Sequence, residues 1–147
     1  MVKEGVAETL KRISEIKKRP DKVAELRRSH NLAIETIADL CFNDNITFKL
    51  PEGDPPYKPN PKNSDMQGML FANLRRFAIF IGANGYENLT QQIREKQFIE
   101  FLESIDCDDA VLVCAIKDKK MPHRNLTKQL FQDAYPSLAS TWKKKNG

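Results

Sequence analysis

The chain contains few residues that form disulfides or bind metals: three cysteines and two histidines among 147 residues. Cys41, Cys107 and Cys114 are odd in number and lie in apolar helical patterns, so we expect reduced thiols. No Cys-x-x-Cys pair occurs, and His30 and His123 are far apart, so no metal site is predicted. No apolar run approaches the roughly 20 residues of a membrane span. The N-terminus also lacks a signal peptide's apolar core. We therefore expect a cytoplasmic protein without membrane contact.

The sequence also lacks the common signatures of catalysis and cofactor binding. It contains no G-x-x-x-x-G-K-[ST], G-x-G-x-x-G, H-E-x-x-H or G-x-S-x-G motif, which predicts no catalytic residues, no cofactor and no enzyme. Asp106, Asp108 and Asp109 have two interpretations, a metal-binding cluster or caps for a helix that starts there. Because carboxylates stabilise the positive end of a helix, we favour the capping interpretation.

Length and charge indicate one domain with a tendency to bind polyanions. The net charge is +4, and 40% of the residues are hydrophobic. A chain of this length forms one domain, and we expect a helical domain over residues 1–139 and a basic tail over residues 140–147. Trp142 beside Lys143 could stack on a nucleic-acid base or anchor the terminus, and we favour the anchor.

Apolar residues recur every three to four positions along most of the chain, which predicts an all-α fold, an irregular bundle of about seven helices. Asn31, Thr90 or Asn88, and Asp106 are expected to cap helices, and Pro136 to end the last one. The predicted helices cover approximately residues 3–18, 20–28, 32–42, 66–81, 90–105, 107–116 and 125–135.

A long proline-rich loop interrupts the helices between Asn43 and Asp65. It holds five of the eight prolines of the chain, at positions 51, 55, 56, 59 and 61. Proline excludes a regular helix or a central strand there. The loop also carries Ile46, Phe48 and Tyr57, which indicates an ordered segment that packs on the body.

Residues 117–128 form the most informative segment, because they combine five basic side chains with His123 ahead of a predicted helix start. Free amides at a helix start and nearby Lys or Arg side chains suit a phosphate. The alternative is a solvated basic turn. The candidate DNA-binding residues in this segment are Lys117, Lys119, Lys120, His123, Arg124, Asn125, Thr127 and Lys128. Further basic groups that could join them are Lys17, Lys18 and Arg19, then Arg27 and Arg28, then Arg75 and Arg76.

The order of these motifs resembles a known family. The run from Phe101 to Ala110, Ile116 to Lys120, Leu126 to Lys128 and Ala134 to Leu138 resembles the end of the helical DNA-binding domain of ATP-dependent DNA ligases of tailed phages. The whole pattern is also similar to a family of small proteins from tailed phages of marine bacteria, with motifs such as K-D-K-K-x-P and A-[FY]-P.

The ligase resemblance implies an all-helical fold that grips duplex DNA across the minor groove through backbone phosphates. The matching positions are Lys117, Lys119, Lys120, Arg124, Asn125, Thr127 and Lys128. Two departures stand out. Met121-Pro122-His123 replaces a turn that tends to be glycine-rich in the ligases, and no K-x-D-G nucleotidyl-transfer motif occurs. Ligase activity is therefore excluded for this chain alone.

Two hypotheses follow from the sequence. The first is a noncatalytic phage-type module that binds double-stranded DNA through the 117–128 segment. The second is an adaptor that binds a phage or host replication or transcription protein through the loop from Pro51 to Pro61, with Tyr57 exposed.

Overall fold

The computed structural model describes residues 4–62, 66 and 68–143, and in these residues the protein is all-helical, as predicted. They form nine α-helices and two short 3-10 helices without a strand, so the bundle has more helices than expected. The α-helices are α1 (Val6–Ser14), α2 (Arg19–Arg28), α3 (Leu32–Phe42), α4 (Met69–Ala72), α5 (Phe77–Ile81), α6 (Gln91–Leu102), α7 (Cys107–Lys117), α8 (Lys128–Ala134) and α9 (Pro136–Ala139). The 3-10 helices are η1 (Leu74–Arg76) and η2 (Ser140–Trp142).

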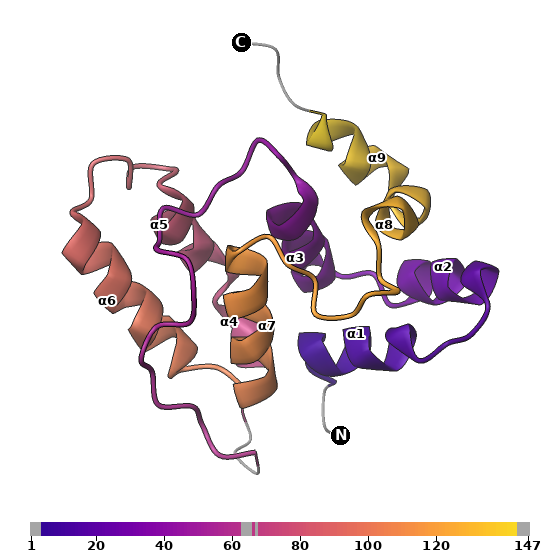
Figure 1. Cartoon of the computed structure of the whole chain (residues 1–147), viewed down its shortest axis with the longest axis horizontal. Coiled ribbons are helices and arrows are strands. Elements are labelled where there is room, and N and C mark those ends of the chain that lie inside the picture. Colours follow the sequence, from indigo (N-terminus) through magenta and orange to yellow (C-terminus); the bar gives the residue numbers. More distant parts are fainter. Residues whose placement is uncertain (1–3, 63–65, 67, 144–147) are drawn as a thin grey trace.

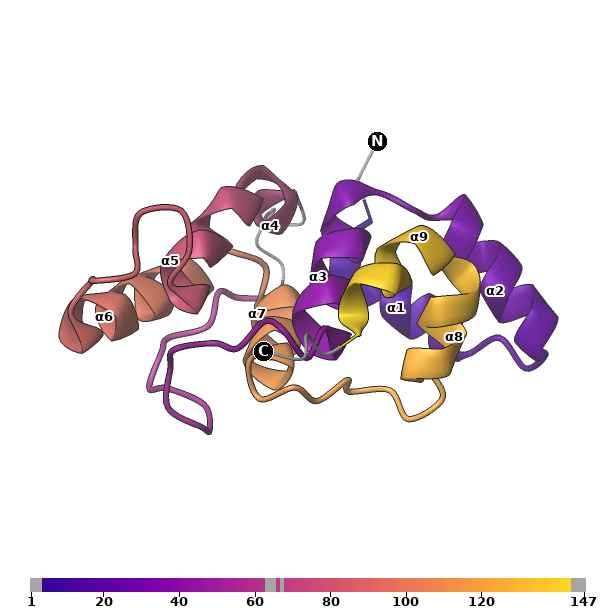
Figure 2. The ribbon, with the colours of Figure 1, turned by 90° about the horizontal axis from the view of Figure 1, so that it is seen from above.

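Helix α7 lies at the centre of the molecule (Figure 1). It packs against α1, α3 and α6. Seen from above, α5 and α6 lie on one side of α7, and α1, α2, α3, α8 and α9 lie on the other, while α4 lies next to α5 (Figure 2). Leu112, Val113 and Cys114 of α7 are consecutive and all buried, so this helix is covered on more than one face.

Aromatic side chains fill the core on both sides of α7. On the α5–α6 side, Phe80 contacts Phe98 at 5.1 Å and Phe101 at 5.3 Å between ring centroids. On the other side, the ring of Phe42 lies 5.3 Å from that of Phe131 and 5.7 Å from that of Trp142. Burial of such large side chains supplies most of the stabilisation of a domain of this size.

The prediction of one continuous helix over residues 66–81 is wrong. In the described residues it divides into α4, η1 and α5, and the break falls at Asn73. The Asn73 side chain donates a hydrogen bond to the carbonyl of Met69 at 2.7 Å, and its backbone N–H donates to Leu70. Asparagine competes in this way with regular helix hydrogen bonds, so an apolar run alone does not ensure a continuous helix.

Two predicted helix boundaries also differ from the structure. The first helix spans Val6–Ser14 rather than residues 3–18, of which Lys3 lies outside the described residues. The last predicted helix starts at Lys128 rather than Asn125, because Thr127 accepts a hydrogen bond from the N–H of Leu130 and caps it. Pro136 follows the end of α8, as expected, and then opens α9.

Three of the helix caps are those that the sequence indicates. Asn31 accepts from the N–H of Ile34 at 2.9 Å, and Thr90, the first of the two candidates, caps α6. Asp106 accepts from the N–H of Asp108 at 3.0 Å and caps α7. These bonds satisfy amides that have no partner inside the helix.

The proline-rich loop is ordered and attached to the body over its described residues, 43–62. Asn60 donates to the carbonyl of Ile105 at 2.7 Å, and the N–H of Lys58 donates to the Glu103 carboxylate at 2.8 Å. Tyr57, which was expected to be exposed, is half-buried and interacts with the thiol of Cys114. Burial chiefly raises the pKa of Tyr57 to about 12. Residues 63–65 of the predicted loop lie outside the described residues.

The C-terminal segment from residue 140 is folded as far as it is described. Residues Ser140–Trp142 form η2, and Trp142 is 1% exposed. The expected boundary at residue 139 therefore does not mark the end of the packed structure, and Trp142 anchors the terminus. Lys144 and Lys145 of the predicted basic tail lie outside the described residues.

Cys41, Cys107 and Cys114 are free thiols, and the first and last are buried. Among the described helices, none combines the length and the apolar character that crossing a bilayer requires.

Candidate functional site

Lys117, the first candidate of the basic segment, is a buried structural residue. Its ammonium group donates to the carbonyl of Pro51 at 2.7 Å and to the carboxylate of Asp118 at 2.6 Å. Asp118 in turn accepts from the N–H of Gly53 at 3.1 Å. The side chain of Lys117 is 1% exposed. It holds the proline-rich loop on the end of α7, so its prediction as a phosphate ligand is wrong.

Lys119, which follows the end of α7, contacts the end of α3. Its backbone has φ +62°, a left-handed conformation that often follows the end of a helix. Its ammonium group donates to the carbonyls of Leu40 at 2.7 Å and Asn43 at 3.0 Å. A cation at the carbonyl end of α3 is favourable. Partial burial lowers the pKa of Lys119, and its contacts are those of a helix cap rather than of a free phosphate ligand.

This role of Lys119 has a measurable consequence for stability. We expect Lys119→Met to lower the free energy of unfolding by about 1–2 kcal/mol, because two carbonyls lose a charged donor. The measurement is urea unfolding at neutral pH. Lys120→Met, which removes the exposed neighbouring charge, is the control and should leave the midpoint nearly unchanged. Equal midpoints for both variants would contradict the capping role.

The residues at the start of α8 also form internal contacts. Thr127 caps the helix, and Asn125 donates a hydrogen bond to the carbonyl of Ser14 at the end of α1. Lys128 lies 3.6 Å from the carboxylate of Asp44. The predicted phosphate site at this helix start is therefore not formed: α8 has seven residues, and the side chains around its first turn have partners within the protein.

The four arginines that were expected to join the segment do not gather around it. Arg27 donates to the carbonyls of Asp133 and Ala134, where α8 ends. Arg28 is exposed and lies 3.7 Å from Glu25. Arg76 stacks over the ring of Phe101 with its guanidinium carbon 5.4 Å from the ring centroid.

Arg75, next to Arg76 on η1, is exposed and lines a groove between α3 and α5. Arg75 and Arg76 belong to the α5–α6 side of α7, whereas Arg27 and Arg28 lie on the other side (Figure 2). The two arginine pairs, which the sequence named as possible additions to the 117–128 segment, therefore do not share one face.

Exposed cations do gather where the 118–127 loop passes the end of α1. The bond from Asn125 to Ser14 brings Arg124 beside the turn that carries Lys17 and Lys18. All three side chains are exposed, and no ion-pair partner is found for them among the described residues. Lys11 lies on α1 and lines a cavity together with His123, the residue before Arg124. We call Lys11, Lys17, Lys18 and Arg124 the basic surface.

Two further candidates lie at the margin of the basic surface. His123 is half-buried, and burial lowers its pKa, an effect that the nearby charge of Lys11 strengthens. It is therefore largely neutral at pH 7. Lys120 is exposed. Burial acts to raise the pKa of Asp118, but the hydrogen bond from Lys117, the N–H of Gly53 and the charges of Lys117 and Lys120 together lower it. Lys120 thus lies near Asp118, whose carboxylate accepts from Gly53 of the proline-rich loop.

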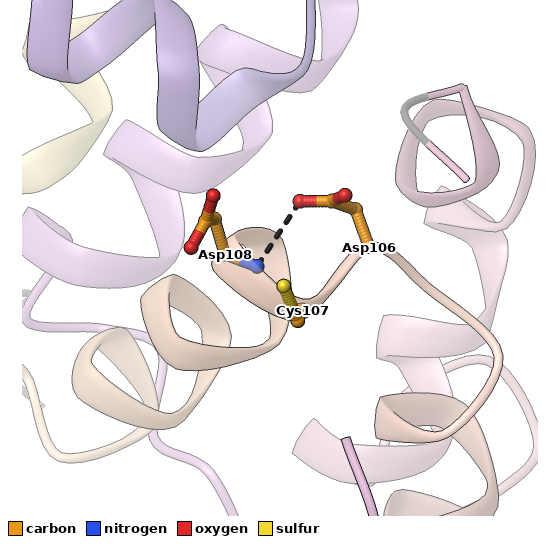
Figure 3. Close-up of side chains that lie close together, drawn as sticks. All are labelled: Asp106, Cys107 and Asp108. Carbon is orange, nitrogen blue, oxygen red and sulfur yellow. Dashed lines mark hydrogen bonds between the residues drawn. The ribbon is translucent and has the colours of Figure 1, made fainter. Parts of the chain in front are cut away.

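Three side chains at the start of α7 lie close enough together to contact one metal ion. The Asp106 and Asp108 carboxylates and the Cys107 thiol place one ligand atom each within 4.8 Å of the others. Their side chains project to the same side of the first turn (Figure 3). Asp106 and Asp108 also line a cavity of about 520 Å³ beside α1. The bond from the Asp108 N–H to Asp106 supports the capping interpretation.

Asp109, grouped with these caps in the sequence, instead caps a different helix. It is 0% exposed, and one carboxylate oxygen accepts from the N–H of Ala7 in α1 at 2.8 Å. The other oxygen has no hydrogen-bond partner in the described residues. Burial raises the pKa of Asp109 to about 7, and the charges of Asp106, Asp108 and Glu8 add to this shift. The sequence contains one indication that α1 needs a cap from elsewhere in the chain, because Gly5, the residue before α1, has no side chain that could provide it.

The described residues form an all-helical fold with a group of exposed cations, the basic surface, near the end of α1. Comparison with known families gives a more specific assignment. The chain belongs to a family of unknown function (DUF6433), whose model matches residues 9–123. This match runs from Thr9, inside α1, through α7 and includes Lys11, Lys17 and Lys18 of the basic surface, but ends before Arg124. No curated protein and no solved structure matched the chain. The resemblance to ligase DNA-binding domains stays a prediction.

Proposed function

We propose that this protein is a noncatalytic module that binds double-stranded DNA through backbone phosphates, using the basic surface rather than the start of α8. The observation that carries the proposal is the contact between Asn125 and Ser14. It joins Arg124 to Lys17 and Lys18, which are separated from it by more than 100 positions in the sequence. Exposed cations on a rigid support neutralise phosphates and release counterions, and this suits binding that does not depend on base sequence.

The net charge of +4 supports the same function, because it attracts a polyanion over distances longer than a contact. The surface has some opposing charge, since the carboxylate of Glu15 lies close enough to His123 to affect its pKa. Glu8, Asp106 and Asp108 line the same cavity as Lys11, so the proposal rests mainly on Lys17, Lys18 and Arg124. The adaptor hypothesis has less support at the position expected for it, because Tyr57 is half-buried and the Pro51–Pro61 loop is tied to α6 and α7.

The test is the salt dependence of duplex binding. In the triple variant Lys17→Ala, Lys18→Ala and Arg124→Ala, the slope of log K against log salt should become shallower by about 2–3, since each lost phosphate contact removes about 0.9. Fluorescence anisotropy of a labelled duplex between 50 and 200 mM salt gives this slope.

A matched control separates a local effect from a change in total charge. The triple variant Lys58→Ala, Arg75→Ala and Lys96→Ala also lowers the net charge from +4 to +1, but its exposed side chains lie on the other side of α7 or in the proline-rich loop. We expect it to retain most of the slope. Equal slopes for the two triple variants, or no duplex binding by the original protein, would overturn the proposal.

A further inference from the structure

A second cavity lies away from the basic surface, between the proline-rich loop, α6 and the end of α7. Its volume is about 170 Å³. This is roughly the space that accommodates one benzene-sized ring. Most of its wall is apolar and consists of Leu50, Pro51, Pro55, Pro56, Phe98 and Ile99.

The walls of this cavity are rigid for two reasons. Proline rings have a fixed backbone angle and little freedom to lose on binding. The bonds of Lys117 to the Pro51 carbonyl and the Asp118 carboxylate hold the loop against α7. Lys117 also lines the cavity, but it is buried and paired with Asp118, so its positive charge is offset by that carboxylate.

Three carboxylates then determine the charge of the cavity. Glu52, Asp54 and Glu95 all line it, and no ion-pair partner is found for them among the described residues. The charge of Asp54 affects the pKa of the buried Cys114 thiol. Burial is the main cause that raises this pKa to about 11, and the negative charge of Asp54 is the next largest cause. An apolar wall with unpaired negative charges favours a ligand that is apolar at one end and positively charged at the other.

We propose that this cavity binds a small organic ammonium ion with a compact apolar body. The apolar body packs against Phe98 and the proline rings, and the ammonium group lies among Glu52, Asp54 and Glu95. Removal of apolar surface from water and attraction to the carboxylates both favour the complex. An anion of the same shape is repelled. The inference does not depend on DNA binding, because none of these residues belongs to the basic surface.

Three probes that share one aromatic ring but are positively charged, neutral or negatively charged test the proposal. The full chain is titrated with benzylammonium, benzyl alcohol and benzoate, and the amide signals of Gly53, Phe98 and Lys117 are followed by NMR. Benzylammonium should give saturable shifts with a Kd of about 1 mM, a typical affinity for a ligand of this size. Benzyl alcohol should bind several-fold more weakly, and benzoate should give no saturable shift.

Two variants on one helix assign the charge effect to the cavity. Glu95→Gln should weaken benzylammonium binding about threefold to tenfold and leave benzyl alcohol binding unchanged. Glu100→Gln, an exposed position of α6 that does not line the cavity, is the matched control and should change neither. The proposal is overturned if benzylammonium gives no saturable shift, if benzoate binds as tightly, or if the two variants behave alike.

Discussion

Replacing Trp142 with alanine should lower the free energy of unfolding by about 3–5 kcal/mol, the usual cost of removing a large buried aromatic ring. Its indole ring is 1% exposed and packs on Phe42, and its N–H donates to the carboxylate of Asp39 at 3.0 Å. This loss is a large part of the total stability of an ordinary domain. Thermal and urea unfolding followed by circular dichroism measure it.

Two further substitutions make this result specific. Trp142→Phe keeps a ring in the core but removes the donor to Asp39, so it should cost about 1–2 kcal/mol. Thr141→Ala changes an exposed neighbour and should have little effect. If the alanine variant at position 142 were as stable as the Thr141 variant, Trp142 would not anchor the terminus.

The second large effect concerns the pH dependence of stability at Asp109. Its pKa is about 7 in the folded protein, against 3.8 for an ordinary aspartate. Because the folded state holds the proton more tightly, the favourable contribution of the protonated carboxyl is complete below about pH 4 and is lost as the pH rises through 7. Between pH 5 and pH 8, this residue should cost the native protein about 2.5 kcal/mol.

Asp109→Asn removes this titration and keeps an oxygen that can accept from Ala7. The measurement is urea unfolding of both proteins from pH 5 to pH 8, with the difference between them as the readout. The carboxylates with lowered pKa, such as Glu4 and Asp118, are common to both proteins and cancel in that difference. The variant should gain about 2.5 kcal/mol relative to the original protein over this range. A constant difference would show that Asp109 does not titrate there.

Local features of the fold were predictable from the sequence, because they depend on neighbouring residues. The caps at Asn31, Thr90 and Asp106 each bond to an amide two or three positions ahead. The all-α class follows in the same way from apolar residues at helical spacing. The break at Asn73 is local too, but an asparagine inside an apolar run has no fixed outcome, since its side chain can also point to solvent.

The candidate site was less predictable, because its side chains depend on partners far along the chain. Lys117 and Lys119 are two positions apart, yet their ammonium groups bond to carbonyls 66 and 79 positions away in different directions. A run of basic residues looks the same in the sequence whether its side chains are exposed to solvent or bonded to other groups of the protein. Lys17, Lys18 and Arg124 could be named as basic residues, but only the fold brings them together.

The cap that Asp109 supplies to α1 also affects the order in which the chain can fold during synthesis. The bond spans 102 positions, so the first helix leaves the ribosome long before its acceptor exists. A helix of nine residues is only marginally stable alone in water. The first helix can contact α2 once both are made, but the cap from Asp109 and the packing on α7 form only after α7 has been translated, so this docking is a late, long-range closure.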